Sequence, residues 1–359
     1  MIKIYQIYLI KLFFKKLLNT TLLFLFLTMI LSIFGEISFF KDSNVNFLLP
    51  ILMSALNAPS TIFEIFPFIF LISTQFFFLE LIDKEELEFL KLISLNNIKI
   101  IKILFFTSFL TGVLLLSLYY GISSKLKFVY FDIKNSYSND NKYLAVVKES
   151  GLWIKDEIDN KIYIINAHKI EGNYLMYVSL NEFDENFNLI RIIESDKIDI
   201  LHNKWSLTNP TIIKDNKINK SNETIFINTH FNKIKINSMF ENLASLNIFQ
   251  LFNLERDYKL LGYSTTEIKS HLHKLYSFPL FLSIMTVLSS ITMLNIKRNR
   301  STVFHLIFGI FLSVLIYYLY YLFNLLGVNG KIPLLLSIYL PILILSMFIL
   351  MGLIRINEK

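Results

Sequence analysis

The sequence predicts a membrane protein with six membrane-spanning helices, three before and three after a β-rich domain outside the cytoplasm. The chain has 359 residues, of which 54% are hydrophobic, more apolar surface than a soluble protein of this length needs. Several apolar runs reach the length of about 20 residues that crosses a bilayer. In the middle of the chain these runs stop, and short alternating segments typical of strands replace them.

The first apolar run, Leu17–Phe40, predicts a retained membrane helix. A cleavable signal peptide is the alternative, but its apolar region would span only about 7–15 residues and would end at small residues. Here the run is longer and no Ala-x-Ala pattern follows it.

The second run, Phe47–Ile82, contains three prolines and is too long for one straight span. We expect an interfacial segment followed by a helix that is kinked at Pro67, because proline breaks the helical hydrogen-bond ladder. The remaining runs are Ile103–Ile122, Tyr276–Ile296, Val303–Leu326 and Ile332–Ile354.

Basic residues cluster at alternate ends of these runs and predict the orientation. With six spans, all the clusters fall on one side, which the positive-inside rule assigns to the cytoplasm. Both termini are therefore expected in the cytoplasm, and the middle domain outside it. The clusters are Lys3, Lys11, Lys15, Lys16; Lys84, Lys91, Lys99, Lys102; Lys297, Arg298, Arg300; and Arg355, Lys359.

These patterns divide the chain into four parts. Residues 1–124 hold the first three spans, with a short cytoplasmic helix at about 83–94. Residues 125–245 form the β-rich domain, whose segments recur every 8–12 residues or so as in a sandwich or open barrel. Residues 246–275 are linker helices, and residues 276–359 hold the last three spans. Trp153 and Trp205 both lie in the β-rich domain and are expected in its core.

No pattern of catalytic or metal-binding residues is found. The chain has no cysteine, which excludes disulfides, thiol catalysis and cysteine-ligated metals. Neither nucleotide-binding glycine pattern is present. His271 and His273 are two residues apart on a helix, so they point to different faces and make a poor metal pair. We expect no catalytic residues, no metal, no cofactor and no nucleic acid partner.

Charged residues near the apolar runs are candidates for function, because a charge at membrane depth is costly. Glu36 and Lys41 lie at the outer end of the first helix, and Glu64 lies just before Pro67. The alternative is that these side chains are at the water boundary.

The loop between the second and third spans is the most informative segment. Five acidic residues occupy the nine positions from Glu80 to Glu88, on a side that is normally basic. Leu87 and Leu90 have helical spacing, and the acidic residues lie in the first turn, where the helix dipole favours them. This pattern indicates either a solvated helix face or a helix that docks into a basic groove on a cytoplasmic partner.

Taken in order, these motifs resemble one family, the lipopolysaccharide export permeases LptF and LptG, over essentially the whole chain. The motifs are Ala58-Pro59, Ile65-Phe66-Pro67, Lys84-Glu85-Glu86-Leu87, Gly151-Leu152-Trp153-Ile154-Lys155, Lys204-Trp205-Ser206-Leu207, Gly262-Tyr263-Ser264, His271-x-His273-Lys274-Leu275 and Pro279-Leu280. The last part is more similar to the G-type subunit than to the F-type, through Gly309–Tyr317, Gly327-Val328, Gly330, Ile332-Pro333 and Pro341.

The resemblance implies a half-transporter of the bacterial inner membrane with a β-jellyroll-like domain in the periplasm. It would pair with a second permease subunit, LptF-like for a G-type chain. It also implies an LptB-like cytoplasmic ATPase dimer, an LptC-like periplasmic bridge protein, and lipopolysaccharide as the lipid. The acidic loop matches the family's coupling helix, with Glu86 at the position of its ATPase-contacting glutamate. The expected coupling residues are Asp83, Glu85, Glu86, Leu87, Phe89 and Leu90.

The sequence departs from the family pattern at two places, after the coupling helix and at the outer end of the first helix. Ser94 stands where the family usually has glycine, and the lysine-rich outer end of the first helix is reduced to Lys41 beside Glu36. Glu36 and Lys41 remain the candidates for contact with the lipid headgroup.

Alternatives to a G-type permease are the F-type subunit and a membrane scaffold that acts through its β-domain without moving lipid. A secondary transporter is disfavoured, because neither ion-relay residues nor inverted repeats are evident.

Overall fold

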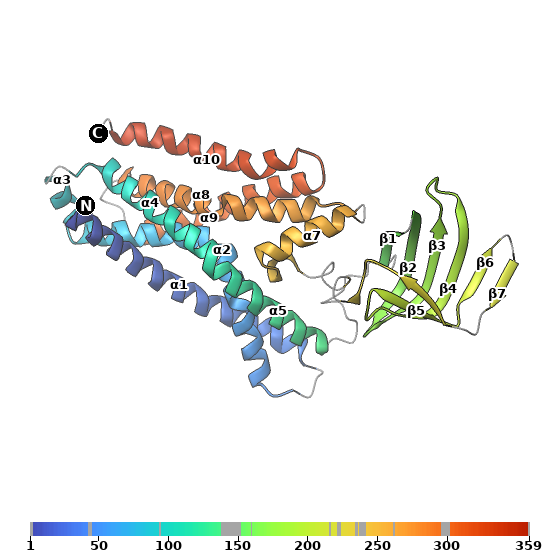
Figure 1. The fold of residues 1–359 in the computed structure, drawn as a ribbon. Coiled ribbons are helices and arrows are strands. Elements are labelled where there is room, and N and C mark those ends of the chain that lie inside the picture. Colours follow the sequence, from blue (N-terminus) through green and yellow to red (C-terminus); the bar gives the residue numbers. More distant parts are fainter. Residues whose placement is uncertain are drawn as a thin grey trace. The chain divides into compact units, whose positions relative to one another are not determined.

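The computed structural model divides the chain into two compact units, Met1–Tyr130 with Thr266–Lys359, and Phe131–Thr265. The first unit is helical, and the second contains the sheet (Figure 1). The structure describes residues 3–41, 45–92, 95–137, 152–158, 160–214, 217–220, 224–233, 236, 242–260, 263–295 and 302–357.

Six helical stretches among the described residues are long and apolar enough to cross a membrane, which confirms the predicted fold class together with the sheet of the second unit. Their elements are α1 (Ile4–Phe39), α2 (Leu48–Asp83), the continuous series α4 (Asn97–Leu114), η1 (Leu115–Tyr119) and α5 (Tyr120–Ser136), then α8 (Thr266–Asn295), α9 (Thr302–Val328) and α10 (Leu334–Asn357). A short helix, α3 (Glu86–Leu92), connects α2 with α4, and α7 (Ile248–Leu260) precedes α8. The expected boundary at residue 276 falls inside α8.

The second span differs from the prediction. Instead of an interfacial segment and a separate kinked helix, α2 is one helix from Leu48 to Asp83, with Pro59 and Pro67 inside it. Membrane helices tolerate internal proline because neighbouring helices and polar side chains can satisfy the freed backbone groups. Nearby, the Tyr119 hydroxyl donates a hydrogen bond to the Pro59 carbonyl at 3.1 Å.

The helix α8 is central in the helical unit. Of its apolar stretch 78% is buried, against 11% for α1 and 17% for α9. Small residues allow close packing around it: a Cβ at Gly112 of α4 would lie 2.7 Å from the Pro279 Cα. The hydroxyl groups of Ser108 and Thr286 form a hydrogen bond of 2.9 Å between α4 and α8. Such small and polar contacts drive helix association in lipid, where the hydrophobic effect between helices is lost.

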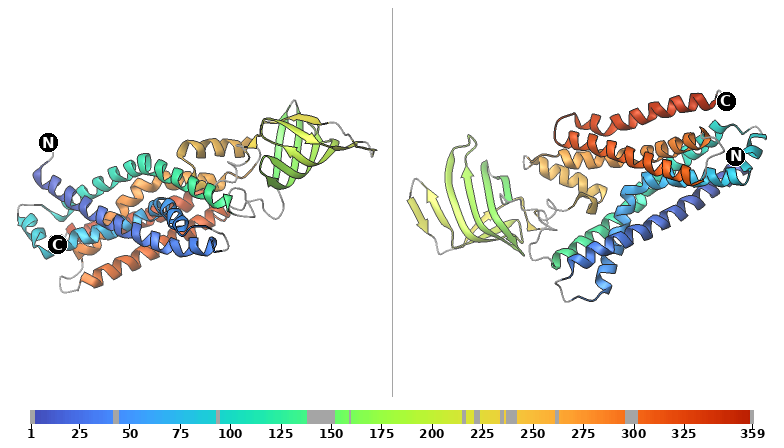
Figure 2. Two further views of the ribbon diagram at one scale, coloured as in Figure 1. Left: turned by 90° about the horizontal axis from the view of Figure 1, so that it is seen from below. Right: turned by 180° about the vertical axis from the view of Figure 1, so that it is seen from behind.

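The second unit contains one antiparallel sheet that curls on itself (Figure 2). The main path is β1-β2-β3-β4-β5-β8, and β6 pairs with β4 and β7. A single sheet with one apolar face buries that face by curling. The strands are β1 (Leu152–Ile158), β2 (Lys161–Glu171), β3 (Tyr174–Phe183), β4 (Leu189–Asp199), β5 (Lys204–Thr208), β6 (Thr211–Lys214), β7 (Lys217–Lys220) and β8 (Ile225–Asn228). The segment Tyr143–Val147, whose sequence pattern also predicts a strand, lies outside the described residues.

The two tryptophans have different environments. Trp205 is fully buried, as predicted, and its indole Nε1–H donates to the Phe231 carbonyl at 2.8 Å. Trp153 is 47% exposed, so the prediction that it lies in the core was wrong. Its neighbours Leu152 and Ile154 are buried, and because successive strand residues point to opposite faces, Trp153 must point outward.

A buried carboxylate connects the two ends of the sheet. Asp156 of β1 is 5% exposed and accepts hydrogen bonds from the Thr229 hydroxyl at 2.7 Å and the His230 backbone N–H at 3.0 Å, just after β8. The His230 Nδ1 also lies 2.8 Å from its other oxygen. The first and last strands of the path are therefore joined through side-chain hydrogen bonds.

Candidate functional site at the α2–α3 corner

The chain reverses direction tightly between α2 and α3. The backbone N–H groups of Lys84 and Glu85 donate to the carbonyls of Glu80 (3.1 Å) and Ile82 (3.0 Å), which closes the end of α2. Glu85 then takes a left-handed conformation with φ +59°, the geometry that commonly ends a helix and usually requires glycine. This turn sets the direction of α3.

The short helix α3 has one buried and one exposed face. Leu87 and Leu90 are only 8% and 6% exposed, so they anchor the helix to the rest of the unit. On the other side Phe89 is 63% exposed and Leu92 is 82% exposed. These two side chains lie three positions apart on the helix, so they form a small exposed apolar area that could contact a partner.

Polar contacts from α1 hold the corner in place. The Tyr8 hydroxyl donates a hydrogen bond of 2.5 Å to the Glu86 carboxylate. Glu80 forms ion pairs with Lys16 of α1 and, at 2.7 Å, with Lys84. The hydrogen bond to Glu80 raises the pKa of Lys84 above its ordinary value. The orientation of α3 therefore depends on α1 as well as α2.

The predicted coupling residues do not all share one surface. Asp83, Glu85 and Phe89 are exposed, Glu86 is half-buried against Tyr8, and Leu87 and Leu90 are buried. The structure thus brings the six together at one corner, but only some of them are accessible to another protein. The described helix, Glu86–Leu92, is shorter than the expected 83–94, and Ser94 lies outside the described residues.

The two headgroup candidates have opposite environments. Glu36 is 4% exposed, and it accepts a hydrogen bond of 2.7 Å from the Tyr130 hydroxyl of α5. Lys41 follows the end of α1 and is exposed. Tyr130 is 94 residues away from Glu36 in sequence, so no local pattern could have predicted this contact.

The third charged candidate, Glu64, is accompanied by two lysines that the sequence did not single out as site residues. Glu64 of α2 is exposed on the helical unit, and the charges of Lys127 (α5) and Lys274 (α8) act on its carboxylate. The Lys127 ammonium also donates to the Asn57 side-chain carbonyl. The only sequence signal was the position of both lysines at the ends of apolar runs.

The histidines of α8 are engaged in hydrogen bonds within the helical unit. The His271 Nε2 lies 3.0 Å from the Tyr120 hydroxyl, and the His273 Nδ1 lies 3.3 Å from the Tyr339 hydroxyl. Within the described residues, no group of three or more histidine, aspartate or glutamate side chains could hold a metal ion. The α2–α3 corner itself offers carboxylates and apolar side chains, which suit binding of another protein.

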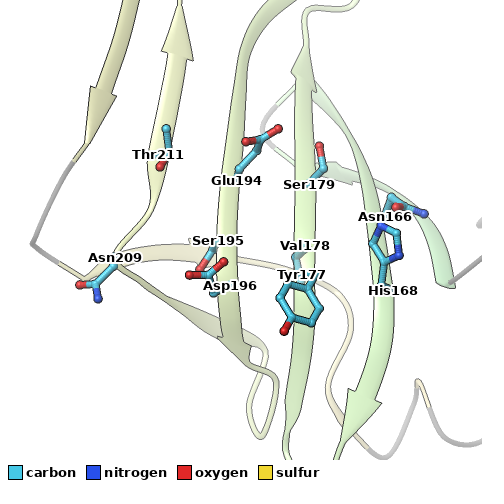
Figure 3. Close-up of a pocket in the computed structure, with 10 residues that line it drawn as sticks. All are labelled: Asn166, His168, Tyr177, Val178, Ser179, Glu194, Ser195, Asp196, Asn209 and Thr211. Carbon is cyan, nitrogen blue, oxygen red and sulfur yellow. The ribbon is translucent and has the colours of Figure 1, made fainter.

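The sheet also carries a polar pocket of about 300 Å³, lined mainly by residues of β2, β3 and β4 (Figure 3). One row of its lining crosses four strands, because Asn166 pairs with Ser179, Ser179 with Glu194, and Glu194 with Thr211. His168, Tyr177, Asp196 and Asn209 line the pocket beside this row.

Comparison with known protein families agrees with these features. The model of the family described as lipopolysaccharide export system permease LptF/LptG matches residues 7–355, nearly the whole chain. No curated protein matches the chain at a significant level. Because the family match spans the six apolar helices, the α2–α3 corner and the sheet, the chain is a multi-pass membrane protein that belongs to the LptF/LptG family of lipopolysaccharide export permeases.

Proposed function

We propose that this chain is the G-type permease subunit of an ATP-driven lipopolysaccharide exporter, and that a separate ATPase docks at the α2–α3 corner. The observation that carries the proposal is the distribution of buried and exposed side chains on α3. Leu87 and Leu90 anchor it from within, while Phe89, Leu92 and the surrounding carboxylates face outward. An ATPase with a basic groove and an apolar pocket would fit this surface by charge and by burial.

ATP hydrolysis is assigned to another chain because this sequence has neither nucleotide-binding glycine pattern. Two copies of an LptB-like ATPase would serve two permease chains. Movement at the corner would then change the spans, and lipid would leave the inner membrane without any covalent chemistry in this chain. With basic residues inside, both termini and the corner lie in the cytoplasm and the sheet in the periplasm.

The lipid path begins at the weakly buried helices. The apolar stretches of α1 and α9 are only 11% and 17% buried, so they offer surface to acyl chains and to a second, LptF-like permease subunit. The sheet domain would pass lipid to an LptC-like bridge protein. Of the two headgroup candidates, the exposed Lys41 is the one able to meet a lipid phosphate, whereas Glu36 is engaged with Tyr130.

Affinity purification of the full chain in detergent from its own cells tests the proposal. We expect an ATPase and a second, F-type permease chain in the eluate. Replacement Glu86→Arg should remove the ATPase and stop lipopolysaccharide export, because it reverses the charge on α3 and breaks the contact with Tyr8. The matched control is Glu157→Arg, a charge reversal at an exposed residue of β1, which should leave both intact.

Each alternative gives a different result. A second permease chain of the G-type would make this subunit the F-type. If the unaltered chain purifies without any ATPase, and its depletion leaves export normal, a scaffold role replaces the proposal. If Glu86→Arg retains the ATPase and normal export, the coupling role of this residue is wrong even though the chain is a permease.

A further inference from the structure

A contact between α2 and α9 is not accounted for by the ATPase site. Gln75 of α2 is fully buried, and its side-chain Nε2 donates a hydrogen bond of 2.8 Å to the backbone carbonyl of His305, in the first turns of α9. The two residues are 230 positions apart in sequence. A side-chain amide is expensive to bury in an apolar bundle unless it is hydrogen-bonded, so this contact sets where α9 lies against α2.

The position of Gly309 explains how the amide fits. One turn after His305, Gly309 lies directly against the Gln75 amide, and a Cβ at this position would overlap both amide heteroatoms. Any larger residue at position 309 would therefore have to push the Gln75 side chain away. Gln75, His305 and Gly309 together form a close α2–α9 contact, which we call the Gln75 clamp.

The clamp has unused hydrogen-bonding capacity. Within the described residues, the Gln75 Oε1 and the His305 Nδ1 are buried without a hydrogen-bond partner. Buried polar atoms without a partner are costly, so a displacement of α9 that gives them partners would be favoured. A contact with such an alternative arrangement is the kind of element that can pass a movement from one helix to another.

The clamp is close to the coupling corner along one rigid helix. Gln75 precedes Asp83, the last residue of α2, by eight residues, which is about 12 Å or two helical turns. The helix α9 is largely exposed outside this contact. A displacement of the corner would therefore reach α9 through Gln75.

We propose that the Gln75 clamp is a positioning contact that couples movement of the α2–α3 corner to α9, and so links ATP hydrolysis to displacement of lipid beside α9. The inference rests on the proposed function. Gln75, His305 and Gly309 act by positioning α9 and need not touch the lipid or ATP.

The test uses the purified permease–ATPase complex in proteoliposomes that contain lipopolysaccharide, with lipid extracted per ATP hydrolysed as the readout. Gln75→Met keeps the length of the side chain but loses the hydrogen bond. We expect the variant to assemble normally and to keep its thermal stability. The amount of lipid extracted per ATP should fall about fivefold or more, because fivefold is the lower end of the typical effect of one site on another. Gly352→Ala is the control, because a Cβ there would lie 2.7 Å from Ile291 in a tight α10–α8 contact without the clamp.

A pair of variants separates packing from coupling. Gly309→Ala alone should lower thermal stability, because the new methyl group overlaps the Gln75 amide. Adding Gln75→Ala removes the amide, so the double variant should regain stability yet remain poorly coupled.

The inference is overturned if Gln75→Met extracts lipid per ATP within about twofold of the unaltered complex, since coupling energies correspond to fivefold or more. It is also overturned if Gly352→Ala lowers the ratio equally, because the effect would then be one of general packing. Failure of the unaltered chain to bind an ATPase or to extract lipid would instead refute the proposed function.

Discussion

Glu85 is the residue on which the direction of α3 depends. It takes a left-handed backbone conformation, φ +59°, between α2 and α3. For a residue with a Cβ this conformation costs roughly 1–2 kcal/mol, whereas glycine adopts it readily. The role of Glu85 can therefore be conformational, through the backbone, or direct, through its carboxylate.

Two substitutions distinguish these roles. Glu85→Gly should keep the ATPase bound and leave thermal stability unchanged or slightly higher, because the backbone strain is relieved. Glu85→Val should weaken ATPase binding and lower the thermal stability, since a β-branched residue is strongly disfavoured at positive φ. The amount of ATPase recovered with each purified variant checks this. Loss of the ATPase in Glu85→Gly would show that the carboxylate itself makes the contact.

Among the elements, the sheet depends on Asp156 to join its first and last strands. This carboxylate accepts hydrogen bonds from Thr229 and His230 while being 5% exposed. Both tryptophans of the chain lie in the sheet unit, so tryptophan fluorescence reports the unfolding of this unit separately from the helices.

Asp156→Ala should destabilise the sheet unit by roughly 1–3 kcal/mol, the cost of leaving buried donors without an acceptor. Asp156→Asn should cost less, because its amide oxygen still accepts a hydrogen bond. Denaturant titration of the full chain followed by tryptophan emission measures the difference. Equal midpoints for the alanine variant and the unaltered chain would mean that this connection does not stabilise the sheet.

A second buried carboxylate makes the sheet unit sensitive to acid. Glu182 of β3 is 1% exposed and lies 2.9 Å from Lys161 and 2.5 Å from Arg191. Burial of the carboxylate opposes its ionisation, but the hydrogen bonds and charges of the two cations outweigh it, so the pKa of Glu182 is lower than its ordinary value.

The pKa of Glu182 is lower in the folded chain than its value of 4.5 in the unfolded chain, so ionised Glu182 stabilises the fold at any pH above 4.5. This stabilisation is lost as the pH falls from 4.5 through the pKa of the folded chain. The midpoint of tryptophan-detected unfolding should therefore fall as the pH is lowered below about 4.5. Glu182→Gln should be less stable at neutral pH and less dependent on pH in this range. A variant with the same pH profile as the unaltered chain would contradict the assignment.

At the scale of the whole molecule, the orientation in the membrane can be tested directly because the chain contains no cysteine. Single cysteines at Lys91 in α3 and Lys217 in β7 replace exposed residues of the two units. We expect an impermeant thiol reagent to label Lys217→Cys in cells with a permeable outer membrane, and Lys91→Cys only after the inner membrane is opened. Labelling of both from outside would refute the predicted topology.

The predictions from sequence succeeded where the pattern is local. The six spans follow from runs of apolar residues long enough to cross a bilayer, and the strands follow from alternation, which defines the apolar face of a sheet. The corner at α3 was found from its acidic first turn and its leucine spacing. The same pattern did not tell which residues are buried, and Leu87 and Leu90 are anchors while Phe89 is exposed.

The sequence by itself therefore determined the six spans and the β-rich region between the third and fourth, the absence of cysteine chemistry and the place of the short helix after α2. Only the tertiary structure decided which distant residues meet, such as Glu36 with Tyr130, Gln75 with His305, and Asp156 with Thr229. It also decided that α2 continues through Pro59 and Pro67. The physical reason is that helices and strands arise from periodicity within about 20 residues, whereas a buried polar group takes its partner from whatever packs against it, at any distance along the chain.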